Sequence, residues 1–377
     1  MASKAKPRLF DAPPADEPGG PIDLGDRPAS EIRTERLSWL WEYRLQHGTV
    51  AIIQGGKGCG KSTWLRALAA AVTGGPAVPP GGRRRVTGNV LWYAGEESAE
   101  KTIRPGLAAA GADLARVFIG EQFSDDPALE LRLPADADRL EKRILVRSAS
   151  LVVLDPLFSF VDASCDLEGP TMPARRYMRA VAAVAKRTGA VILLSRNLTK
   201  DKSRGAIASG RGSAEIGNQA RSILHIDQVP SNPGVYGLAV AACNDGRKVS
   251  TILYRIEEEG GSAVIRPCGD SEIDADQLAA GDEGLIEAKA IDRAKALVRH
   301  MIPTGKVNSD TLRKRAEEAL ISVRTLQKAL NLLGCVNIRE GSREDTVSFW
   351  SPPPGGWKAP TASARAQQAP RARRKKQ

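Results

Sequence analysis

The chain has 377 residues, of which 42% are hydrophobic, and it carries a net charge of +11. This length suits about two domains of roughly 150 residues each, with a sizeable core in at least one. No apolar run approaches the ~18 residues of a membrane span, and residues 1–10 lack the apolar core of a secretory signal. We therefore expect a cytoplasmic protein without a membrane partner.

Cysteine and histidine form no pattern typical of a metal site. The five cysteines are scattered, and none belongs to a C-x-x-C pair, which argues against a disulfide framework or a zinc site. The three histidines, His47, His225 and His300, are isolated from any cysteine or carboxylate cluster. We assign them no metal-binding or catalytic role.

The two ends of the chain have biased compositions. Residues 1–30 are rich in Pro, Gly and Asp and are predicted to be disordered. Residues 353–377 form a basic tail, whose last twenty residues contain seven Lys or Arg and no acid. A flexible basic tail favours a polyanion through counterion release, without reading its sequence. A solvated tail that only aids solubility is the alternative.

The strongest motif is a glycine-rich loop between an apolar run, residues 50–53, and a helix-like segment that starts near Thr63. Glycines let the backbone N–H groups converge on phosphate oxygens, and the helix N-terminus adds its positive dipole end. The loop reads Gly55-Gly56-Lys57-Gly58-Cys59-Gly60-Lys61-Ser62. It predicts an ATP site in which Lys61 reaches the β- and γ-phosphates and the Ser62 hydroxyl holds Mg²⁺.

Acidic residues follow two later strand-like segments. Residues 151–154 are apolar and end in Asp155, which is the form of a buried strand that delivers a carboxylate to a metal shell. Residues 89–94 are followed by Glu96 and Glu97, either of which fits a residue that polarises the water attacking the γ-phosphate. The structural alternative is that these acids only favour the dipole of a helix capped by Ser98.

A fourth strand-like segment, residues 190–194, leads to Asn197. This amide is placed to hydrogen-bond the γ-phosphate, and a merely capping role is equally compatible with its position. The following loop is basic and rich in small residues, a composition typical of long functional loops. Its Lys202, Arg204 and Arg211 are candidates for contacts with DNA phosphates or for an arginine finger in a neighbouring subunit's site, and a solvated loop is the alternative.

The order of elements predicts an α/β domain over residues 31–258, with a mostly parallel central sheet extended by antiparallel strands. Residues 259–284 are acidic and glycine-rich and are predicted to be a linker. Three helix-like segments and a hairpin over residues 285–352 suggest a winged helix. Arg324 and Lys328 would then face a DNA groove, with Arg339 in the wing near phosphate. A helical oligomerisation module is the alternative.

The chain resembles the RecA-fold ATPases of the RepA type in a set of motifs and in their order along the chain. These motifs are the P-loop, Gly95-Glu96-Glu97-Ser98, Leu154-Asp155-Pro156-Leu157, Arg196 to Lys200 and Arg211 to Ser222. The resemblance implies that Lys61 and Ser62 are the Walker A pair, that Glu96 activates water and that Asp155 belongs to the metal shell. It also implies that Arg211 or Arg221 is the finger that acts on a neighbouring subunit. The chain departs from the family pattern at Asn197, where relatives commonly have His.

The resemblance further implies a homo-oligomer, expected to be hexameric, that hydrolyses ATP between protomers to translocate on or unwind DNA during phage or plasmid replication. The expected cofactors are ATP and Mg²⁺, and the expected partner is single-stranded DNA in the channel, with duplex DNA at the C-terminal module. One alternative is a recombination or DNA-remodelling ATPase that does not unwind. Another is an origin-binding or regulatory protein in which ATP only switches the oligomeric state.

Overall fold

A computed structural model describes residues 27–78, 88–120, 129–169, 171–199, 205–230, 232–341 and 346–357, with the backbone alone over 283–289. The chain divides into two units, residues 1–38 and 39–377, and the described part of the first is an exposed stretch with one turn, η1 (Ala29–Glu31). Residues 1–26 of the expected disordered segment, residues 358–377 of the expected basic tail, Lys202 and Arg204 lie outside the described residues.

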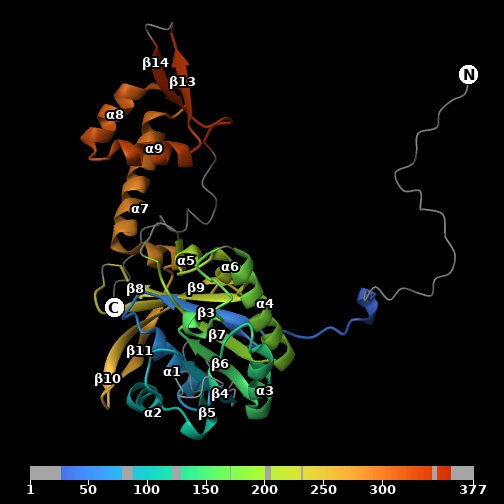
Figure 1. Ribbon diagram of the computed structural model, residues 1–377. Helices are drawn as coiled ribbons and strands as arrows, with labels where there is room; N and C mark the ends of the chain where they lie inside the picture. Colours follow the sequence, from blue (N-terminus) through green and yellow to red (C-terminus); the bar gives the residue numbers. More distant parts are fainter. Residues whose placement is uncertain are drawn as a thin grey trace, which may run out of the picture. The chain divides into compact units, whose positions relative to one another are not determined.

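The second unit is built on a nine-stranded sheet, counted over the described residues, with the order β11-β10-β9-β8-β3-β7-β6-β4-β5 (Figure 1). The six strands from β8 to β5 are parallel, and β9, β10 and β11 extend the sheet in antiparallel fashion. This confirms the predicted α/β class with a mostly parallel sheet. The strands are β3 (Val50–Gly55), β4 (Asn89–Ala94), β5 (Val117–Gly120), β6 (Ala149–Asp155), β7 (Val191–Asn197), β8 (Ser222–Gln228), β9 (Tyr236–Cys243), β10 (Thr251–Glu259) and β11 (Ser262–Ser271).

Helices cover both faces of this sheet, as continuous apolar strands require. On one face α1 and α2 bury Trp64 and Leu107, and Trp41 stacks on Trp64 with ring centroids 5.8 Å apart. On the other face α3, α4 and α6 bury Ile144, Tyr177 and a further set of side chains. The bounds are α1 (Lys61–Val72), η2 (Ala99–Ile103), α2 (Arg104–Ala109), η3 (Leu114–Arg116), α3 (Ala137–Arg147), η5 (Leu157–Phe160), α4 (Thr171–Thr188), α5 (Gly205–Ala208) and α6 (Ala214–Gln219). Strands β1 (Trp39–Trp41) and β2 (Leu45–Gln46) pair in a separate small sheet.

The structure corrects the prediction that residues 259–284 are a linker. These residues hold β11 and the start of α7 (Ala275–Met301), and β10 and β11 pair over their whole length around Gly260 and Gly261. Both glycines have positive φ, 57° and 76°, which is the backbone of a tight hairpin turn. A Gly-Gly pair that follows three glutamates is typical of a flexible connection in a sequence, whereas here it closes a hairpin.

The C-terminal part of the chain has its own core. α7 packs against α9 (Val323–Leu332) and α8 (Ser309–Glu318), and the three helices bury Val298, Leu312 and Leu326. Strands β12 (Val307–Asn308), β13 (Val336–Glu340) and β14 (Val347–Ser351) form an antiparallel sheet in the order β12-β14-β13. The helices and the hairpin thus occur in the predicted order. None of the described helices is long and apolar enough to cross a membrane.

The hairpin turn gives a direct test of this assignment. A Cβ on Gly260 meets no atom within 4 Å, so substitution there is opposed only by the positive φ. We expect Gly260→Val to lower the free energy of unfolding by about 1–2 kcal/mol, because a β-branched residue is strained in the left-handed region. Gly260→Asn is the matched control and should lose much less. Equal stability of the two variants in chemical denaturation would contradict a tight turn at this position.

Candidate functional site

Four parallel strands bring the residues predicted from the sequence to one edge of the sheet. The register pairs Gly55 of β3 with Asn197 of β7, and Ala94 of β4 with Asp155 of β6. Since these strands run in the same direction, the P-loop, Asn197, Asp155 and Glu96 all follow carboxyl ends at the same edge, where open α/β sheets bind their ligands. β7 lies between β3 and β6, so the ends of these two strands are two strand spacings, or about 10 Å, apart.

The backbone of the loop has the shape that its glycines permit. Gly58 and Gly60 have φ of 82° and 85°, in the left-handed region that L residues rarely adopt. A Cβ on Gly55 would lie 2.6 Å from the carbonyl oxygen of Ile226, so only glycine fits where β3 passes β8. Helix α1 begins at Lys61, with the Trp64 N–H donating to the Gly60 carbonyl at 2.8 Å. The loop therefore ends on a helix N-terminus, which favours an anion.

Lys61 lies over the loop that precedes it. Its Nζ donates to the carbonyl oxygens of Gly55 and Gly56 at 3.0 and 2.9 Å. Burial lowers the pKa of Lys61 below its ordinary value, while the nearby Asp155 and Glu96 carboxylates oppose this shift. The ammonium group is thus hydrogen-bonded to the loop carbonyls and lies close enough to both acids to interact with them electrostatically. This position suits a lysine that binds the terminal phosphates.

Ser62 and Asp155 meet across the cleft between α1 and β6. The Ser62 hydroxyl donates to Oδ2 of Asp155 at 2.7 Å. A hydroxyl and a carboxylate are hard oxygen ligands, the kind that Mg²⁺ prefers, and Mg²⁺ sites with only one or two protein ligands leave room for phosphate oxygens and water. The donor set therefore fits the predicted metal position. The contact also fixes the start of α1 against the tip of β6.

The two neighbouring glutamates have different surroundings. Glu97 forms an ion pair with the buried Arg66, with Oε2 of Glu97 2.8 Å from the guanidinium. Glu96 is exposed, lines the same cleft as Lys61, and has no hydrogen bond or ion pair to any described residue. A general base must be free to reach a water, so this difference favours Glu96 over Glu97. The sequence alone did not separate the two.

These residues line one cleft of about 650 Å³. Asn197 lines this cleft and is exposed, and the Ser195 hydroxyl, two residues earlier on β7, is fully buried without a hydrogen-bond partner among the described residues. Ser195 was not predicted as a site residue, although it lies two residues before Asn197 on the same strand. The wall that Ile256, Ser262 and Ala263 provide was also not predicted, because the turn at residues 260–261 and strand β11 were taken for a linker.

The β10–β11 hairpin also contacts the P-loop. The Tyr254 hydroxyl on β10 donates to the carbonyl oxygen of Cys59 at 2.6 Å, and its ring meets Trp64 edge-on with centroids 5.2 Å apart. Cys59 itself is buried, and burial is the main cause that raises its thiol pKa to about 11. A thiol with so high a pKa is unreactive near neutral pH. Its role in the loop is packing.

The two candidate finger arginines lie at different ends of the sheet. The Arg211 backbone N–H donates to the Asn197 carbonyl at 2.8 Å, which places Arg211 at the edge that carries the P-loop. Its exposed guanidinium pairs with Glu168 and lies over Phe158. The Arg221 N–H donates to Val50 at the start of β3, so Arg221 is at the opposite edge, about 17 Å away along the strand. There it pairs with Asp245 at 2.7 Å.

The three candidate DNA-binding residues that the structure describes are not part of this cleft. Arg324 and Lys328 are exposed on α9, and Arg339 is exposed on β13. All three belong to the C-terminal helices and hairpin, whose core is separate from the sheet cores. These three residues and the predicted nucleotide residues thus belong to different parts of the chain.

A buried polar row lies one residue back from the cleft. Gln54, Arg196 and His225 are register partners on β3, β7 and β8, and each is 1% exposed or less. The Arg196 guanidinium donates to Oε1 of Gln54 at 2.6 and 3.0 Å, and burial lowers its pKa to about 10. Neither ring nitrogen of His225 has a partner among the described residues. A histidine set aside in the sequence analysis is therefore one of the most buried polar groups of the fold.

Part of the chain, including this site, is similar to known proteins. Residues 22–203 match the family model described as AAA domain, and the matched stretch includes the P-loop, Glu96, Asp155 and Asn197. No curated protein matches the chain. A KaiC-like protein, PH0186, from the hyperthermophilic archaeon Pyrococcus horikoshii OT3 is a similar solved structure, with 16% identity, 59% of this chain and 91% of that chain covered, and a TM-score of 0.41.

Residues 22–203 are therefore similar to an AAA domain, and this similarity agrees with the observed P-loop of an ATPase. This confirms the predicted nucleotide-binding class. The strand order, with β7 between the P-loop strand and the Asp155 strand, fits a RecA-like core. At its TM-score the solved structure is too dissimilar for any property to be transferred from it.

His225 predicts a pH dependence of stability. Burial lowers its pKa from 6.5 to about 4 in the folded chain. Between these values the unfolded chain binds a proton that the folded chain does not, so stability falls as pH is lowered through this window, by about 3 kcal/mol in total. In His225→Leu the unfolding free energy should depend less on pH between 6.5 and 4. The exposed His300→Gln is the control. An unchanged pH profile in His225→Leu would contradict this assignment.

Proposed function

We propose that the protein is an ATP-hydrolysing DNA motor of the RepA-like helicase type, which translocates on or unwinds DNA during phage or plasmid replication. The observation that carries the ATPase part is a single cleft in which Lys61, the Ser62–Asp155 pair and an unpaired Glu96 are brought together. In this cleft a phosphate-binding loop, oxygen ligands for a metal and a free carboxylate are all available. These are the parts that phosphoryl transfer to water requires.

The proposed roles follow from where each group lies. The N–H groups of residues 56–61 and the Lys61 ammonium hold the phosphates of ATP. Ser62 and Asp155 would hold Mg²⁺, which when bound neutralises charge on the phosphates. The Glu96 carboxylate accepts a proton from the attacking water. Asn197, which is exposed in the cleft, donates its amide N–H to the terminal phosphate and so distinguishes ATP from ADP.

We further propose that the protein acts as a ring of identical subunits, hexameric by resemblance, with ATP between neighbours. An arginine finger must then reach the site of the adjoining subunit. Arg211 is the better candidate of the two, since it lies beside Asn197 at the nucleotide edge and its guanidinium is exposed. Its pairing with Glu168 is between two half-exposed side chains, and such pairs are weak enough to exchange.

The DNA part of the proposal is supported by the C-terminal helices. We propose that residues 285–352 act as a winged helix, with α9 in a groove and β13 and β14 as the wing. Arg324 and Lys328 are exposed on α9, and its N-terminus is capped by Ser322, which accepts from the Thr325 N–H at 3.1 Å. The same surface favours a second candidate, a duplex-binding regulator in which ATP only switches the oligomeric state.

The two glutamates provide a matched pair of variants. Glu96→Gln should keep ATP binding and lose turnover by about 10²-fold or more, because the amide cannot accept the proton from water. Glu97→Gln should keep most of the turnover but unfold more easily, by about 1–3 kcal/mol, because Arg66 loses its charged partner. The measurements are steady-state hydrolysis, nucleotide binding and thermal unfolding. Normal turnover in Glu96→Gln would move the base to Glu97.

The α9 surface predicts a salt effect on duplex binding. The double variant Arg324→Ala, Lys328→Ala should bind DNA more weakly and reduce the slope of log K against log salt by about 2, one for each lost phosphate contact. Arg313→Ala, Lys314→Ala on the exposed face of α8 removes the same charge and is the control. The slope is measured by fluorescence anisotropy at several salt concentrations. Equal slopes in both double variants would contradict a role for α9.

A further inference from the structure

Gln54 and Arg196, the hydrogen-bonded pair of the buried polar row, also contact the short helix α5. Nε2 of Gln54 donates to the Ala206 carbonyl, and Nη2 of Arg196 donates to the Ile207 carbonyl at 3.4 Å. The last carbonyl oxygens of a helix have no partner within it, and side-chain donors at the C-terminus can satisfy them. The pair therefore joins β3 and β7 to the end of α5.

The Arg196 guanidinium also fixes the residue that precedes Arg211. A Cβ on Gly210 would overlap this guanidinium, so the Gly210 backbone packs directly on it and only glycine fits there. The same stretch is bound to the end of β7 by its backbone: Gly210 forms a β-bridge with Leu198, and the Arg211 N–H donates to the Asn197 carbonyl at 2.8 Å. Arg196 is thus enclosed between β7 and the segment that carries Arg211.

The first turn of α7 holds the other end of α5. The Ala206 N–H donates to Oδ1 of Asp276 at 2.8 Å. Ala206 is fully buried and packs with Leu278 and Ala279 of α7 in one apolar cluster. Segment 205–211 is therefore fixed to α7 at its start, and to the strands that carry the P-loop and Asn197 by the Gln54–Arg196 pair.

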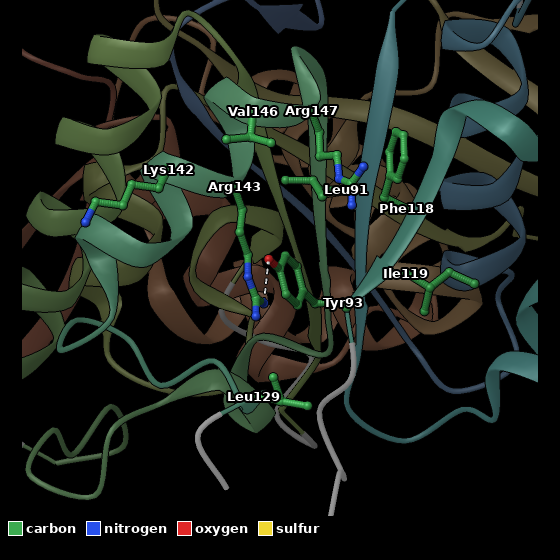
Figure 2. Close-up of a pocket in the computed structure, with 10 residues that line it drawn as sticks. Leu91, Tyr93, Phe118, Ile119, Leu129, Lys142, Arg143, Val146 and Arg147 are labelled. Carbon is green, nitrogen blue, oxygen red and sulfur yellow. Dashed lines mark hydrogen bonds between the residues drawn. The ribbon is translucent and has the colours of Figure 1, made fainter. Parts of the chain in front are cut away.

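Arg143, in the cavity beside β5, is an arginine with a different set of contacts. It is half-buried on α3, and its guanidinium donates to the Tyr93 hydroxyl of β4 at 3.3 Å (Figure 2). Neither Arg143 nor Tyr93 lines the nucleotide cleft. Arg143 is therefore a matched control for Arg196, since both guanidinium groups bond an uncharged side chain but only that of Arg196 contacts segment 205–211.

We propose that Arg196 is a positioning residue, which together with Gln54 holds segment 205–211 so that Arg211 has a fixed place beside Asn197. The planar guanidinium suits this task because its donors have fixed directions toward several acceptors. Arg196 does not line the nucleotide cleft, so its loss should act through Arg211 and leave the affinity for ATP unchanged. The role in turnover rests on the proposed function, in which Arg211 acts on the ATP of a neighbouring subunit.

Hydrogen exchange of the full-length chain tests whether the pair holds this segment. Arg196→Met should speed amide exchange in a peptide covering residues 205–213 by about tenfold or more, because local opening then breaks fewer contacts. Arg143→Met is the control and should leave this peptide unchanged. Unchanged exchange of the peptide in Arg196→Met would overturn the inference.

A milder variant covers the case in which Arg196→Met unfolds the whole chain. Gly210→Ala keeps Arg196 but displaces its guanidinium, and it should speed exchange in the same peptide. Gly217→Ala is its control, because a Cβ there makes only ordinary contacts, the nearest at 3.5 Å. Equal exchange in the two alanine variants would overturn the inference.

ATP hydrolysis shows whether the segment acts through Arg211. Arg196→Met should lower kcat by about 10–100-fold with little change in KM, since a misplaced group costs rate rather than binding. The double variant Arg196→Met, Arg211→Ala should be no slower than Arg211→Ala alone, because both changes remove the same interaction. Losses that multiply in the double variant would overturn the inference. Normal turnover in Arg211→Ala would instead contradict the finger of the proposed function, and the exchange result would then decide the inference by itself.

Discussion

The constraint on which the rest of this structure depends is the parallel register of four buried strands. β3, β7, β6 and β4 are buried along most of their length and mainly apolar, so they require helices on both faces, and helical crossovers keep them parallel. Every carboxyl end then falls at one edge. Because the strand order puts β7 between β3 and β6, the ends of β3 and β6 are about 10 Å apart, and the cleft is lined by the P-loop, Asp155 and Glu96, which lie at or follow these strand ends.

The remaining elements hold that edge in place. The β10–β11 hairpin forms one wall of the cleft, and its Tyr254 hydrogen-bonds the loop at Cys59. Gln54, Arg196 and His225 form a fully buried polar row directly behind the residues that face the nucleotide. A buried polar group without a hydrogen-bond partner among the described residues, such as His225, lowers the stability of the fold. Buried polar groups that are hydrogen-bonded, such as Arg196 and Gln54, favour one arrangement of the strands. The candidate site is therefore backed by polar as well as apolar contacts.

Much of this could be predicted from the sequence because the signals are local. The P-loop glycines, the apolar runs and the acids that follow them are consecutive residues, and the parallel sheet brings them together without further information. Long-range pairing left no such signal: the turn at Gly260 and Gly261 resembled a linker, and Ser195 and His225 resembled ordinary strand residues. The difference between Glu96 and Glu97 also could not be seen, because it depends on Arg66, which lies 31 positions earlier in the chain. The cavity beside β5 depends on side chains from three separate elements.

The most direct test of the central claim, that this ATP site drives work on DNA, is the rate of ATP hydrolysis by the purified chain with and without single-stranded DNA. Lys61→Ala is the blank, because its loss removes the ammonium group from the loop. A DNA motor predicts strong stimulation by single strands that is absent from the blank. Slow turnover at the same rate with and without DNA would contradict the motor and favour the regulator whose function lies in the C-terminal helices.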